Sequence, residues 1–107
     1  MHILLDECVP RPLRWEFVGH VVSTIRDMGW AGKKNGELLA LMAGAGFEVL
    51  LTVDQNLRYQ QNLAASGVAV VVLVATSNHL KQLVPLVSSA LVALGSIQPG
   101  DVVEIVV

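Results

Sequence analysis

Five short apolar runs recur along the chain, separated by segments that carry helix and turn signals. The runs cover residues 2–5, 20–24, 48–53, 68–74 and 102–107. Each is short and rich in Val, Ile or Leu, which predicts a β-strand. The run over 68–74 is almost unbroken, a pattern typical of a strand that helices cover on both faces of a sheet.

The segments between these runs predict helices and turns. Pro10 and Pro12 favour a helix over about residues 11–17, because proline is tolerated in the first helical turn. Asn35 is predicted to be the N-cap of a helix that runs to about residue 45 and closes at Gly46. Residues 26–34 contain two glycines and predict a loop.

Two further helical regions follow. Residues 56–65 predict a helix that stops at Gly67. Asn78 is predicted to cap another helical region, in which Pro85 separates a short turn from a main helix ending at Leu94.

Strands and helices therefore alternate along the whole chain. This alternation predicts an α/β fold: a three-layer α/β/α domain with a mainly parallel five-stranded sheet and right-handed crossovers. The first strand should be central, with the third beside it. The pattern leaves open the position and direction of the last strand. A length of 107 residues suits a single domain.

Composition narrows the class of protein. A hydrophobic content of 53% with 15% charged residues excludes a disordered tail. The formal net charge of −2 does not indicate nucleic-acid binding by bulk charge. The basic residues are concentrated in the first half, however, and could form a local rim around an acidic centre. They are Arg11, Arg14, Arg26, Lys33, Lys34 and Arg58.

The expected location follows from weaker signals. Cys8 is the one cysteine, so no intramolecular disulfide can form, which fits a reducing compartment. We find no signal-peptide pattern at the start. The apolar runs are shorter than the roughly 20 residues that a membrane helix needs. We expect a soluble cytoplasmic protein with no membrane segment.

Acidic residues follow two of the predicted strands. Asp6 and Glu7 come directly after the first run and Asp54 after the third, while Glu37 lies in the first turn of a predicted helix. Carboxyl ends of parallel strands open onto the ligand crevice of an α/β sheet. Carboxylates gathered there would repel each other unless a cation such as Mg²⁺ or Mn²⁺ offset their charge.

Each acid also has a simpler interpretation. Asp54 could close an Asx-turn or cap the next helix. Glu7 could pair with Arg11 or Arg14, and Glu37 could serve the helix dipole alone. Cys8 is predicted to be a small, buried apolar residue rather than a reactive thiol.

Four segments together resemble the compact bacterial PIN-like domains, which are similar to the toxin nucleases of VapC-type toxin–antitoxin pairs. They are Met1-His2-Ile3-Leu4-Leu5-Asp6-Glu7, Gly19-His20-Val21-Val22, Asn35-Gly36-Glu37-Leu38-Leu39 and Leu50-Leu51-Thr52-Val53-Asp54-Gln55-Asn56-Leu57. The resemblance spans most of the chain. It implies a PIN-like fold, Mg²⁺- or Mn²⁺-dependent cleavage of RNA and a protein antitoxin as partner.

The resemblance also assigns roles. Asp6 matches the acid after the first strand, Asp54 the acid of the T-x-D segment and Glu37 the acidic helix start. Asparagine stands at two positions that are commonly acidic in the family, Asn35 and Asn56, and it can coordinate a metal without adding charge. Fewer charged ligands imply a lower metal affinity.

The resulting hypothesis is metal-assisted hydrolysis. Asp6, Asp54 and Glu7 would hold the metal, Glu37 would help or orient the attacking water, and the six basic residues named above would contact phosphates. Two alternatives stay open. One is a non-catalytic PIN-like module that binds a protein. The other is a receiver-like phosphoacceptor domain, which would need a lysine after the fifth strand, whereas no lysine follows Lys81.

Two features favour a partner. The segment over 83–94 is apolar on nearly all sides, which indicates either complete burial or cover by a homodimer partner or an antitoxin. Trp15, Trp30 and Tyr59 could stack on RNA bases or could simply pack in the core.

Overall fold

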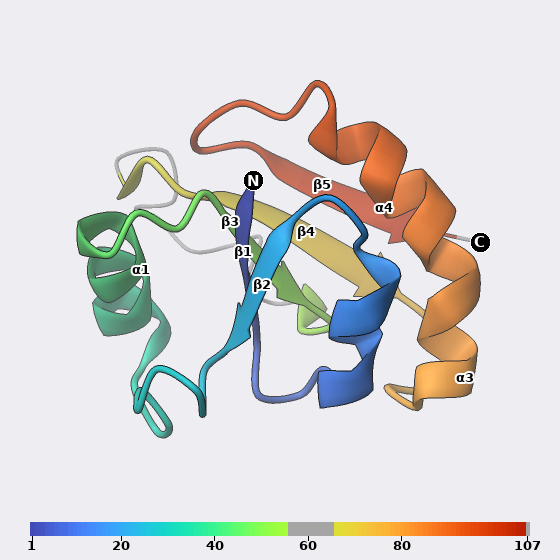
Figure 1. Ribbon diagram of the computed structural model, residues 1–107, viewed down its shortest axis with the longest axis horizontal. Coiled ribbons are helices and arrows are strands. Elements are labelled where there is room, and N and C mark those ends of the chain that lie inside the picture. The colour runs from blue at the N-terminus through green and yellow to red at the C-terminus, as the bar shows by residue number, and fades with distance from the viewer. Residues whose placement is uncertain (56–65, 107) are drawn as a thin grey trace.

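A five-stranded parallel sheet forms the centre of the molecule in the computed structural model, which describes residues 1–55 and 66–106 (Figure 1). Its strand order is β2-β1-β3-β4-β5, and every neighbouring pair is parallel. The strands are β1 (His2–Leu5), β2 (Val21–Thr24), β3 (Val49–Thr52), β4 (Ala69–Val74) and β5 (Val102–Val106). The predicted α/β fold is therefore confirmed.

Strand placement follows the prediction where one was made. β1 lies inside the sheet between β2 and β3. β5, whose place the sequence left open, is an edge strand that runs parallel to β4. All five carboxyl ends consequently lie at one edge of the sheet, so the residues after β1, β2 and β3 come near one another.

Helices cover both faces of the sheet, which gives the three layers. On one face, Ile3 and Leu5 pack with residues of η1 (Arg11–Glu16), α3 (Leu80–Leu83), η3 (Val84–Leu86) and α4 (Val87–Leu94). On the other face, Leu4 packs with residues of α1 (Asn35–Gly44). Figure 1 shows α1 on the opposite side of the sheet from α3 and α4. Successive buried residues of β1 thus point to opposite faces of the sheet, so this strand contributes to both cores.

The helix predicted over about residues 11–17 is present, but as a 3₁₀ helix over residues 11–16. Two cap predictions were wrong. The N-cap of α1 is Lys34 rather than Asn35, which is the first helical residue. The N-cap of α3 is His79 rather than Asn78, because the Asn78 amide instead donates to the Cys8 carbonyl at 3.1 Å. The helix predicted over 56–65 lies outside the described residues.

The apolar segment near the C-terminus packs by one face. α4 buries Val87, Ala90 and Leu94 against the sheet, whereas Val92 is 78% exposed. The burial of this helix therefore needs no partner. Among the described residues, no helix combines the length and apolar character that a bilayer crossing requires.

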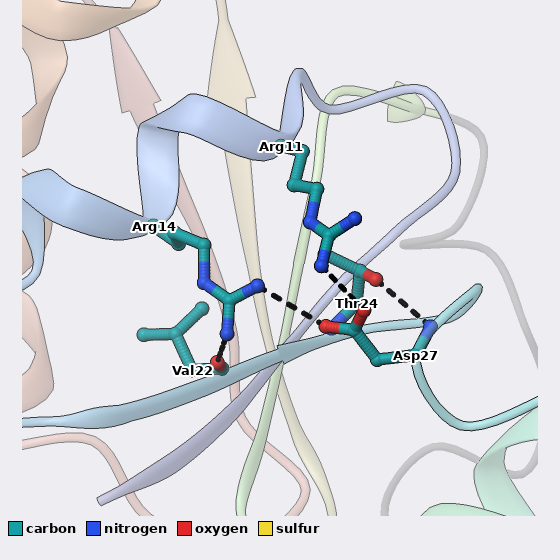
Figure 2. Close-up of polar contacts among 5 residues, drawn as sticks. All are labelled: Arg11, Arg14, Val22, Thr24 and Asp27. Atoms are coloured by element: carbon teal, nitrogen blue, oxygen red, sulfur yellow. Dashed lines mark hydrogen bonds and ion pairs between the residues drawn. The ribbon is translucent and has the colours of Figure 1, made fainter.

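The outer edge of β2 is closed by side chains. The amide of Val21 donates to the Met1 carbonyl, and the amide of Ile25 donates to the Leu5 carbonyl. The backbone groups of Val22 and Thr24 therefore point away from β1. Arg14 donates to the Val22 carbonyl at 2.9 Å, and the Thr24 amide donates to Asp27 Oδ2 at 3.1 Å (Figure 2). Arg14 and Asp27 also pair with each other at 3.2 Å. Their side chains thus take the positions that backbone groups of a further strand would occupy.

Truncation of the central strand should destabilise the whole fold. Leu50 is fully buried in β3, and Leu50→Ala should cost about 2–5 kcal/mol in the free energy of unfolding, measured by urea denaturation. The control Val92→Ala, on the exposed side of α4, should change it by less than about 0.5 kcal/mol. Equal effects of the two substitutions would contradict the central place of β3.

Candidate functional site

The carboxylate of Asp6 is held at the end of β1 by two hydrogen bonds. Its backbone amide donates to the Leu51 carbonyl at 2.9 Å, which continues the pairing of β1 with β3. Asp6 Oδ1 accepts from the Glu7 amide at 2.9 Å, and Oδ2 accepts from the Thr52 hydroxyl at 2.7 Å. Asp6 is half-buried, so one side of the carboxylate stays open to solvent.

Thr52 links the ends of β1 and β3. Its side chain is fully buried, and its hydroxyl donates to Asp6 and accepts from the Asp54 backbone amide at 3.0 Å. The segment after β3 is thereby brought beside Asp6, as predicted from the order of the strands. Sequence reasoning missed the role of Thr52. The signal was a hydroxyl at the end of an otherwise apolar buried strand, where it needs a partner.

Cys8 lies against the same cluster. Its Sγ is 3.7 Å from Asp6 Oδ2 and 3.7 Å from Thr52 Oγ1. Burial raises the pKa of the Cys8 thiol, and the nearby Asp6 charge adds to the rise. The thiol therefore stays neutral at pH 7 and is a poor nucleophile, in keeping with the packing role predicted for it.

A cleft of about 430 Å³ opens beside Asp6, at the ends of β1 and β2. Half of its wall is apolar: Leu5, Val9, Pro10, Ile25 and Ala31. The other half is polar: Asp6, Glu7, Arg11, Thr24 and Arg26. Glu7 accepts a hydrogen bond from the Gly32 amide at 2.9 Å, which fixes the loop over 26–34 along the rim. The structure thus places a carboxylate pair and two guanidinium groups around one opening.

Glu37 does not line this cleft. It is exposed in the first turn of α1 and forms an ion pair with Lys33 at 3.2 Å. Asp54 is half-buried after β3 and is likewise not part of the cleft wall. Residues 1–55 and 66–106 contain no group of three or more His, Cys, Asp or Glu side chains that could hold a metal ion. No three of the predicted acids therefore form such a group within these ranges.

Some of the residues predicted to bind phosphate form ion pairs with acidic residues, and others do not. Arg11 and Arg14 both pair with Asp27, at 2.9 and 3.2 Å (Figure 2). Lys33 is engaged with Glu37, while Lys34 is exposed beside it. Arg26 lines the cleft and has no acidic partner among the described residues. Arg58, Asn56 and the Asn35 side chain lie outside what the structure describes.

Comparison of the chain with protein-family models, with curated proteins and with solved structures finds no match. The function therefore has to be argued from the site itself.

Loss of the Thr52 hydroxyl should weaken the link between β1 and β3. Thr52→Val keeps the side-chain shape but removes the donor to Asp6 and the acceptor for the Asp54 amide. We expect a loss of about 1–3 kcal/mol in the free energy of unfolding by urea denaturation. Thr52→Ser retains the hydroxyl and should lose less. A valine variant as stable as the wild type would show that these bonds contribute nothing.

The Asp27 network should make stability depend on acid pH. The Thr24 amide, with Arg11 and Arg14 adding to its effect, holds the pKa of Asp27 below its ordinary value of 3.8. A lowered folded-state pKa stabilises the protein above the unfolded pKa, and this stability is lost as pH falls through the folded pKa. The wild type should therefore exceed Asp27→Asn in urea midpoint at neutral pH, and the difference should shrink below about pH 4. A difference that stayed constant down to about pH 2 would contradict this linkage.

Proposed function

We propose that this protein is a metal-dependent, PIN-like nuclease that hydrolyses RNA phosphodiesters. The observation that carries the proposal is the position of Asp6: a carboxylate fixed by Thr52 at the carboxyl end of a central strand, in the wall of a cleft that also holds Arg11 and Arg26. An acid for a cation and guanidinium groups for phosphate are the two requirements of phosphoryl chemistry.

The donor set fits a hard divalent cation with few protein ligands. An ionised carboxylate has about four acceptor positions, and the hydrogen bonds from Glu7, Thr52 and the Cys8 thiol use three of those on Asp6. Mg²⁺ commonly binds through one or two carboxylates and keeps several waters beside substrate phosphates. Asp6 would therefore be the principal ligand, with Asp54 or Glu7 acting directly or through water. A bound Mg²⁺ or Mn²⁺ would supply stabilisation of charge on the phosphoryl oxygens.

The arginines would bind and orient the substrate. Arg26 is the cleft cation without an acidic partner among the described residues. Arg11 shares Asp27 with Arg14 but is 61% exposed, so it retains donors for a phosphate. The raised pKa of the Cys8 thiol disfavours a thiolate nucleophile, and water would be the nucleophile in this proposal.

A second candidate, the protein-binding module, is favoured by one surface. Trp15, Val18 and Val21 are 74%, 83% and 64% exposed and lie at η1 and the start of β2. A groove of about 360 Å³ runs between these elements. Exposed apolar residues in a group are typical of protein contact sites. An antitoxin or a second copy of the chain would suit this surface, with or without nuclease activity.

The nuclease proposal is tested by metal-dependent cleavage of a mixed pool of RNA. The wild type should cleave in Mg²⁺ or Mn²⁺ and stop when the metal is chelated. Asp6→Asn should lower the rate about 100-fold or more, because a metal ligand contributes several kcal/mol to the transition state.

The matched control is Glu16→Gln, the same change of charge at an exposed acid of η1 outside the cleft. It should cleave like the wild type. If folded wild-type protein leaves all RNA intact with both metals, the nuclease proposal fails and the protein-binding module becomes the better account.

A further inference from the structure

The cleft beside Asp6 has more apolar wall than a phosphate site needs. A phosphate is bound by donors and positive charge alone. Here Pro10 and Ala31, with the nearly buried Val9 and Ile25, line the same cleft as the charged groups. At about 430 Å³ the cleft falls within the range of roughly 300–1,000 Å³ that is usual for small-molecule sites. It therefore has room for a flat apolar group as well as an anion.

We propose that this cleft is a base-binding subsite that takes one unstacked nucleotide of a single-stranded RNA, next to the phosphate bound near Asp6. The inference rests on the proposed function and extends it by naming the substrate form. A nucleobase has apolar faces and polar edges, which match the two halves of the wall. A base paired in a duplex exposes only an edge in a groove, whereas an unpaired base can leave the stack and enter a pocket.

Arg26 is the residue best suited to hold the base. It comes from the loop after β2, lines the cleft and has no acidic partner among the described residues. A guanidinium plane can stack on a base or bind the phosphate beside it. Glu7, exposed in the same wall, offers carboxylate acceptors to the base edge.

The rim of the cleft is held in place before any ligand binds. The Glu7 carboxylate accepts from the Gly32 amide at 2.9 Å, and this bond fixes the loop that carries Arg26 and Ala31 beside the end of β1. The proposed base subsite and Asp6 consequently lie in the wall of the same cleft. A base in the cleft would set which phosphate lies at the carboxylate.

The test measures binding of short RNA by fluorescence anisotropy with the metal chelated, so that cleavage plays no part. Ala31→Phe places a ring in the cleft and should weaken binding of a single-stranded oligouridylate at least about tenfold, since a stacked base contributes on that scale. The matched control Ala40→Phe, at an exposed position of α1 outside the cleft, should bind like the wild type. Arg26→Ala, with the fold checked by circular dichroism, should weaken binding similarly.

A strand with the same phosphates but abasic sugars separates base recognition from phosphate attraction. The wild type should bind it at least about tenfold more weakly than the oligouridylate, and Ala31→Phe should bind it as the wild type does. Equal affinity of the wild type for both strands would overturn the base subsite, as would unchanged binding by Ala31→Phe.

The two proposals fail in different ways. If binding depends on the base and is lost in Ala31→Phe, but the wild type does not cleave RNA in Mg²⁺ or Mn²⁺, the nuclease proposal fails and the subsite stands. If cleavage requires Asp6 but does not change with Ala31→Phe or with removal of the base, the subsite fails and the nuclease proposal stands.

Discussion

The hydrogen bond from Thr52 to Asp6 is the interaction on which the candidate site depends. Thr52 is fully buried, so its hydroxyl must be satisfied within the protein. It donates to Asp6 at 2.7 Å and accepts from the Asp54 amide at 3.0 Å. The carboxylate after β1 is thereby fixed to β3, the central strand of the sheet. Sites supported in this way by a rigid element keep their geometry better than sites on loops.

The charges around the cleft are divided unevenly. Asp27 engages both Arg11 and Arg14, and Lys33 engages Glu37. Arg11, Arg14 and Lys33 would therefore have to share their donors between an acidic side chain and a phosphate. Arg26 is left as the cleft cation with no acidic partner in the described part of the chain. A small number of available charges suits recognition of one nucleotide better than attraction of a long polyanion, in keeping with the net charge of −2.

The fold could be predicted because its signals are periodic and local. Short apolar runs that alternate with helix signals predict a parallel sheet. The buried residues of β1 point alternately to the two faces and contribute to both cores. The caps could not be predicted, because an asparagine can bind elsewhere: Asn78 reaches the Cys8 carbonyl, about seventy residues away along the chain.

The site was partly predictable for a related reason. Strand order brings the residues after β1 and β3 together, so Asp6 and the Asp54 backbone meet at Thr52. The ion-pair partners of Glu37 and of the arginines depend on how side chains meet across loops. The pattern of apolar and polar residues does not predict such pairs. Asp27 drew no attention in the sequence, yet it binds two arginines and the Thr24 amide. A lone acid in a glycine-containing loop gives no sign of such a role.

The closed edge of β2 has a consequence for how this molecule can assemble. Edge strands are natural templates for pairing with another chain. Here the Val22 carbonyl and the Thr24 amide are already bound by Arg14 and Asp27. An incoming strand that paired with these two groups would first have to displace the ion pair of Arg14 and Asp27. This cost disfavours extension of the sheet, and hence fibre growth, through β2.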